Sequence, residues 1–202
     1  MKIDPNIIIE EANKIQGWFN EDDLKFLINK INLYKTPINV FEIGPFKGKS
    51  TIAILMSLPE NSNLFCIDLF SDNNDFDFDG EIIGKITGKE LLNMFIENTN
   101  SIIDKYNLQT INLEIITDDT MSFMIANENK FANYFDFIFI DGDHRYEGIK
   151  HDFICCLDFL KEGKILSGHD YGPHCEGVYN FIKNEIKTVK TAGGRSSIWY
   201  ID

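Results

Sequence analysis

The first 35 residues carry apolar positions at helical spacing. A helix after Asn20, a candidate N-cap, is indicated by four residues at i, i+3, i+4 and i+7: Leu24, Leu27, Ile28 and Ile31. An earlier stretch, residues 6–18, follows a similar pattern. The sequence therefore predicts two N-terminal helices (residues 1–35) ahead of a larger core (residues 36–202).

In that core, short apolar runs alternate with amphipathic stretches. The runs predict strands at residues 38–43, 63–68, 111–116, 135–140, 164–167 and 196–201. The stretches between them predict helices at residues 50–58, 88–106, 119–129, 147–161 and 176–187. This alternation predicts an α/β fold in one domain of residues 1–202, with a mostly parallel sheet covered by helices on both faces. In such sheets ligands bind beyond the carboxyl ends of the strands, so functional residues are expected just after each strand.

Residues 70–86 interrupt the alternation. The segment is acidic, contains glycines and is dotted with phenylalanines. This composition fits a lid over the carboxyl edge of the sheet, and it fits a disordered surface loop equally well.

The overall charge limits the classes of partner. A net charge of −13, from 32 acidic and 19 basic residues, repels the phosphate backbone of nucleic acids. No segment has the apolar length of a transmembrane helix, and the N-terminus lacks the apolar stretch of a signal peptide. Four cysteines without CxxC spacing predict reduced thiols. We therefore expect a cytoplasmic protein that binds neither nucleic acid nor a membrane.

A glycine-containing loop follows the first predicted strand and opens a helix. It has the form E-x-G-x-x-x-G-x-S, from Glu42 through Gly44 and Gly48 to Ser50. Glycines let the backbone turn sharply and approach a ligand closely, and the helix start presents free N–H groups. The loop resembles the glycine motif of class I methyltransferases, which implies a ligand with a positive sulfonium centre, and a carboxylate at the strand end suits such a ligand.

The same loop also resembles a Walker A phosphate-binding loop, with Gly-Lys-Ser at its end. Three residues separate Gly44 from Gly48, where Walker A requires four, and Glu42 would face the phosphates. A P-loop NTPase or kinase is therefore kept as an alternative. A second alternative is a binding protein that uses this fold without catalysis. The spacing does not match the G-x-G-x-x-G loop of NAD-binding folds.

Acidic residues also follow the next two strands. Asp68 ends the second strand, where an acid accepts hydrogen bonds from ribose hydroxyls in nucleotide-binding folds. Asp118 and Asp119 follow the third strand. The series predicts a nucleoside cofactor with these candidate binding residues: Glu42, Gly44, Gly48, Ser50, Asp68, Asp118, Asp119 and Asp141.

Acids and histidines follow the fourth and fifth strands. Asp141, Asp143 and His144 come after one strand, and His169 with Asp170 after the other. Neighbouring parallel strands would bring the two turns side by side. Carboxylates with imidazoles suit a divalent metal, or a general base whose pKa lies near neutrality.

Four blocks together resemble a known family: F-E-I-G-P-F-K-G-K-S-T, I-D-L-F, F-I-D-G-D-H-R-Y-E-G and G-H-D-Y. They are similar to the catechol-O-methyltransferase-like class I methyltransferases, and most of all to the small bacterial branch of the macrocin O-methyltransferases, which methylates sugars and natural products. The resemblance spans about residues 15–175. It implies a Rossmann-like methyltransferase fold with a mostly parallel seven-stranded sheet and S-adenosylmethionine as cofactor, with the adenine near Asp118 and Asp119.

The resemblance also implies a magnesium-type site at Asp141, His169 and Asp170. Catechol enzymes carry Asp then Asn where this chain has His169 and Asp170. His144 occupies the place of their catalytic lysine, three residues after the metal aspartate, which makes it the preferred base, with Asp143 in reserve.

The expected activity is a metal-assisted O-methyl transfer from S-adenosylmethionine to a small hydroxylated molecule, a sugar or natural product. The expected partners are this small-molecule acceptor and a second copy of the chain. The N-terminal helices and the last strand are the candidate surfaces of such a homodimer.

Overall fold

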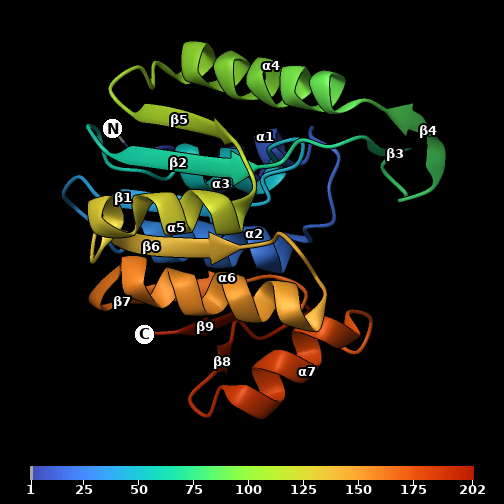
Figure 1. Ribbon diagram of the computed structural model, residues 1–202. Coiled ribbons are helices and arrows are strands. Elements are labelled where there is room, and N and C mark those ends of the chain that lie inside the picture. Colours follow the sequence, from blue (N-terminus) through green and yellow to red (C-terminus); the bar gives the residue numbers. More distant parts are fainter. Residues whose placement is uncertain (1) are drawn as a thin grey trace.

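Seven strands form the central sheet of the computed structural model, which describes residues 2–202. In chain order they are β1 (Asn39–Ile43), β2 (Asn63–Asp68), β5 (Asn112–Thr117), β6 (Phe135–Ile140), β7 (Leu160–Gly168), β8 (Lys190–Thr191) and β9 (Trp199–Ile201). Their order across the sheet is β5-β2-β1-β6-β7-β9-β8 (Figure 1). Neighbours from β5 to β7 pair in parallel, and β9 runs antiparallel to both β7 and β8. The expected mostly parallel seven-stranded fold is confirmed.

Helices cover both faces of this sheet (Figure 1). One face carries α1 (Pro5–Ala12), α2 (Glu21–Ile31), α3 (Lys49–Leu55) and α4 (Gly88–Tyr106). The other carries α5 (Thr120–Phe131), α6 (Tyr146–Phe159) and α7 (Glu176–Glu185). Successive strand residues point to opposite faces, so Val40 packs in the first core and Phe41 in the second. Two apolar layers therefore hold the sheet rigid, and the loops at its carboxyl edge are presented from fixed positions.

The N-terminal segment differs from the predicted pattern in one respect. α1 ends at Ala12 instead of continuing to residue 18, and residues 13–19 form a turn before α2. The predicted N-cap is confirmed: the side chain of Asn20 accepts from the backbone of Asp22 and Asp23, and the Asp23 carboxylate accepts from the Asn20 backbone at 2.9 Å. This capping box starts α2 immediately after the turn.

The C-terminal part of the sheet extends beyond the predicted strands. β7 spans nine residues instead of the four expected at 164–167. The two-residue strand β8 was not predicted, because two exposed polar residues carry no alternation of apolar and polar positions. The last strand is confirmed at a shorter length, three residues long.

Residues 70–86 do not form a disordered loop. They contain an antiparallel hairpin of β3 (Asn73–Phe76) and β4 (Ile82–Ile86), which stands away from the main sheet in Figure 1. Ile86 of β4 is buried in the first core, and two further contacts come from β3. Lys47 forms a 2.7 Å ion pair with Asp75, and the ring of Trp18 meets Phe76 edge-on with centroids 4.9 Å apart. The segment is thus an ordered hairpin, and its role as a lid stays a prediction.

The surfaces expected for a homodimer also make contacts within the chain, and the homodimer stays a prediction. α1 and α2 pack on α3, and β9 lies between β7 and β8 instead of at an open edge. No helix within residues 2–202 combines the length and the apolar character needed to cross a bilayer.

Candidate functional site

A pocket of about 990 Å³ opens at the carboxyl edge of the sheet. It lies where the strand order changes direction around β1 and β6, the position at which open α/β sheets bind ligands. Loops after β1, β2, β5, β6 and β7 contribute to its wall, together with residues 16–20. Nearly all of the side chains singled out from the sequence line this one pocket.

The glycine loop turns as expected. Gly44 and Gly48 both have positive φ angles, +77° and +99°, a region that favours glycine. The backbone N–H of Gly44 donates to Ile67 at 2.9 Å, which connects the loop to β2. Gly48 is the N-cap of α3, so the loop leads directly into free N–H groups at the start of a helix.

Glu42 lies behind the pocket wall instead of facing its interior. Its carboxylate is fully buried and accepts hydrogen bonds from the hydroxyls of Ser50 at 2.5 Å and Thr51 at 2.7 Å. Burial raises the pKa of Glu42 to about 7, although these hydrogen bonds oppose the shift. Ser50 is itself at the pocket, with its hydroxyl committed to Glu42. In this arrangement Glu42 fixes the first turn of α3.

Three further acids line the pocket at the ends of β2 and β5. Asp68 accepts from the backbone N–H of Phe70 at 2.8 Å and of Phe46 at 3.3 Å, one bond to each oxygen, and burial raises its pKa. Each oxygen keeps acceptor capacity for a hydroxyl. Asp118 and Asp119 are exposed at the rim, where Asp119 also caps α5.

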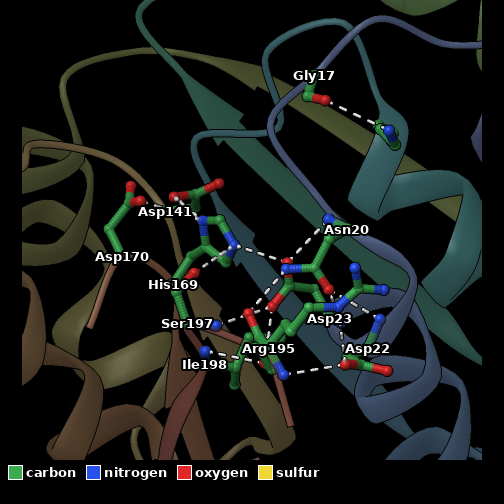
Figure 2. Close-up of polar contacts among 12 residues, drawn as sticks. Gly17, Asn20, Asp22, Asp23, Asp141, His169, Asp170, Arg195, Ser197 and Ile198 are labelled. Carbon is green, nitrogen blue, oxygen red and sulfur yellow. Dashed lines mark hydrogen bonds and ion pairs between the residues drawn. The ribbon is translucent and has the colours of Figure 1, made fainter. Parts of the chain in front are cut away.

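Asp141, His169 and Asp170 converge as the sequence predicts. Their ligand atoms all lie within 4.8 Å of one another, and Nδ1 of His169 is 3.7 Å from Asp141 Oδ1 and 3.5 Å from Asp170 Oδ1 (Figure 2). The set combines carboxylate oxygens with one imidazole nitrogen in a largely buried place, which is a donor set suited to a small divalent cation. The residues present therefore fit the implied metal.

The charges of this cluster are strongly coupled. Burial alone would lower the pKa of His169, but Asp141, Asp170 and Asp23 outweigh it and raise the pKa to about 10. Burial would raise the pKa of Asp170, but His169 and His144 hold it at about 2. Burial raises the pKa of Asp141. A cation bound here would displace the proton from Nδ1 of His169 and take its place beside Asp141 and Asp170.

His144 lies at the pocket beside this cluster. Its Nε2 is 3.0 Å from Asp170 Oδ2 and 3.6 Å from Asp141 Oδ1, and its side chain is 52% exposed. The hydrogen bond with Asp141 raises the pKa of His144. Asp143 instead turns to Arg145, whose guanidinium and backbone N–H both donate to it and lower its pKa. Asp143 is therefore a weak proton acceptor.

Several lining residues were missed from the sequence. Phe19 stacks on the ring of His169, with centroids 4.3 Å apart, and Ser197 bonds its Nε2 at 2.9 Å. Lys49, half-buried with a pKa lowered by burial, donates to the Gly17 carbonyl at 3.3 Å. The family resemblance over about residues 15–175 reaches this N-terminal segment, whereas the C-terminal segment with Ser197 lies outside it.

Comparison with known proteins places the chain in a family. A family described as "Methyltransferase domain" matches residues 41–171. No curated protein sequence matches. The fold is similar to that of an O-methyltransferase from Bacillus cereus in complex with SAH (19% identity, 97% of this chain and 87% of that chain, TM-score 0.57).

Two further solved structures share the fold. One is the O-methyltransferase TomG from Streptomyces achromogenes, involved in tomaymycin synthesis and in complex with SAM (14% identity, 99% and 89% coverage, TM-score 0.61). The other is a Corynebacterium glutamicum protein (12% identity, 99% and 90% coverage, TM-score 0.63).

The family match covers more than half of the chain and spans the glycine loop and both Asp–His turns. It does not favour the phosphate-binding alternative. The chain therefore belongs to the methyltransferase-domain family, as an S-adenosylmethionine-dependent methyltransferase with the class I fold.

Proposed function

We propose that the protein is a metal-assisted O-methyltransferase that transfers the methyl group of S-adenosylmethionine to a small hydroxylated molecule, a sugar or natural product. The observation that carries this proposal is the convergence of Asp141, His169 and Asp170 beside His144, in the pocket that also contains the glycine loop. The similarity to TomG, which acts in the synthesis of a natural product, supports the acceptor class.

The cofactor would occupy the half of the pocket formed by β1, β2 and β5. Gly44 and Gly48 give the loop its turn through their positive φ angles, although Gly44 lines the pocket and Gly48 does not. Asp68 would accept from the ribose hydroxyls. Asp118 and Asp119 lie farther along the same edge, where the adenine would lie. A volume of about 990 Å³ is at the upper end of the range for ligand pockets, which leaves space for an acceptor.

Asp141, His169 and Asp170 would hold the cation. When bound, a divalent cation lowers the pKa of a coordinated hydroxyl and orients neighbouring oxygens of the acceptor. Nδ1 of His144 would then accept the hydroxyl proton, while Nε2 keeps its own proton toward Asp170, 3.0 Å away, which stabilises the imidazolium. The acceptor oxygen forms a bond to the methyl carbon while the carbon–sulfur bond breaks and its electron pair stays on sulfur. Positioning by the rigid strand ends supplies much of the acceleration.

A direct test begins with binding. Calorimetry and thermal shift with S-adenosylmethionine, S-adenosylhomocysteine, ATP and NAD should show binding of the first two alone. Binding of ATP without S-adenosylmethionine would contradict the proposal.

Turnover is tested next, with a panel of polyhydroxylated acceptors and release of S-adenosylhomocysteine as readout. Exhaustive chelation should abolish release, and added Mg²⁺ should restore it. Release that survives chelation would remove the metal from the mechanism and leave a metal-free His144 base.

A further inference from the structure

Asp23 makes contacts that its helix does not require. The side chain, at the start of α2, is fully buried, and its Oδ2 lies 3.4 Å from Nε2 of His169 (Figure 2). Its Oδ1 accepts from the Ser196 hydroxyl at 2.7 Å and from the Ser197 backbone at 3.0 Å. Capping of α2 uses the bond to the Asn20 backbone and explains none of these other contacts.

The two nitrogens of His169 face different surroundings. Nδ1 points to Asp141 and Asp170, whereas Nε2 points away from them to Asp23 and to the Ser197 hydroxyl (Figure 2). Phe19 stacks on the ring at an interplanar angle of 18°. The ring is therefore held at one face and at both nitrogens.

We propose that Asp23 is a positioning residue that keeps one imidazole proton of His169 on Nε2, so that Nδ1 is the nitrogen that loses its proton and binds the cation. The inference rests on the metal site of the proposed function. An imidazole that binds a metal through one nitrogen carries its remaining proton on the other, and a carboxylate acceptor there fixes both tautomer and ring orientation.

The burial of Asp23 supports a role beyond capping. A buried carboxylate is costly unless charged or polar partners compensate it, and a neutral residue could cap the helix without that cost. Besides the adjacent turn before α2, the partners come from two distant parts of the chain, the loop after β7 and the segment before β9. Asp23 thus links the N-terminal helices to the metal site.

The test compares Asp23→Asn with Asp22→Asn. The neighbouring Asp22 is a matched control because it also accepts a backbone N–H from the C-terminal segment, that of Arg195 at 3.0 Å, and lies outside the contacts of His169. Mn²⁺ affinity is measured by electron paramagnetic resonance, with His169→Ala as baseline. We expect Asp23→Asn to weaken Mn²⁺ binding about tenfold or more, the scale of outer partners of metal ligands, and Asp22→Asn to change it less than about twofold.

Nitrogen NMR of the imidazole provides a readout that a structural role would not move. In the Mg²⁺-loaded wild type, the proton of His169 should be on Nε2, and this measurement does not depend on the folding of any variant. A proton on Nδ1 would overturn the inference, as would unchanged Mn²⁺ affinity in folded Asp23→Asn.

Both of these results leave the proposed function intact, provided that the wild type binds Mn²⁺ more tightly than His169→Ala. Equal binding by those two proteins would instead refute the metal site, and the role of Asp23 with it.

Discussion

Gly44 lies against the backbone of Asp141, so closely that a Cβ on Gly44 would be 2.1 Å from the Asp141 carbonyl oxygen. The contact joins the loops after β1 and β6, and the Asp141 backbone N–H in turn donates to Ile43 at 2.9 Å. The glycine loop and the first candidate metal ligand therefore share one rigid backbone unit. Cofactor and cation would be held in a constant relation by this contact.

Gly44→Ala should destabilise the protein by roughly 3 kcal/mol or more, because strain from the positive φ adds to a backbone clash. Gly163→Ala is the matched control, since Gly163 also has a positive φ, +67°, with nothing within 4 Å of its Cβ position. That control should cost about 1 kcal/mol. Urea unfolding measures both, and equal losses would show that the close contact is unimportant.

Lys49 should bind the carboxylate of the cofactor. Its ammonium is half-buried at the pocket, and the bond to Gly17 leaves further N–H donors free. Lys49→Met should weaken S-adenosylmethionine by about 1.5–3 kcal/mol, the scale of a hydrogen bond to a charged group. Decarboxylated S-adenosylmethionine should bind the variant and the wild type alike in calorimetry.

Lys47→Met is the control for the comparison of S-adenosylmethionine with its decarboxylated form, because Lys47 forms its ion pair with Asp75 of the hairpin. It should leave the ratio of the two affinities unchanged. A Lys49→Met variant that weakens both ligands equally would argue for a packing role.

Glu42 should make the stability of the protein depend on pH. Its pKa rises from 4.5 to about 7 on folding, so between these values the folded chain keeps a proton that the unfolded chain has released. Raising the pH through this window therefore removes stability, by up to about 3 kcal/mol. Glu42→Gln should flatten this loss in urea unfolding measured from about pH 4.5 to 8.

Part of the slope should remain in that variant. Burial also raises the pKa of Asp152 to about 7, so its carboxyl contributes in the same direction. Identical slopes in the wild type and in Glu42→Gln would show that Glu42 is ionised throughout this range.

His144→Ala should lower turnover about 10²–10⁴-fold, the usual effect of losing a positioned base. S-adenosylmethionine should still bind, because the cofactor half of the pocket lies on the other strand ends. His151→Ala is the matched control on α6, where His151 contacts Asp152 and Cys155. Normal turnover by His144→Ala, measured as release of S-adenosylhomocysteine, would transfer the role of base to another group.

The convergence of Asp141 with His169 and Asp170 follows from the sequence, because parallel strands place their carboxyl ends at one edge and the alternation of elements is visible in the apolar pattern. The glycine loop could also be predicted from the sequence, because positive φ angles favour glycine and the start of a helix has a local sequence pattern. The family resemblance added the cofactor and the order of the sites.

Contacts between distant segments had no such signature. Asp23 and Ser197 are 174 residues apart in the chain, and the local sequence around neither residue predicts that both contact His169. Glu42 bonds to Ser50 and Thr51 and does not enter the pocket. Adjacent residues of a strand face opposite sides of the sheet, and the position of α3 determines which side of β1 is covered by this helix. The periodicity of apolar residues in the sequence determines which face of a helix or strand is buried. The tertiary packing of the helices and strands determines which partners each buried polar side chain contacts.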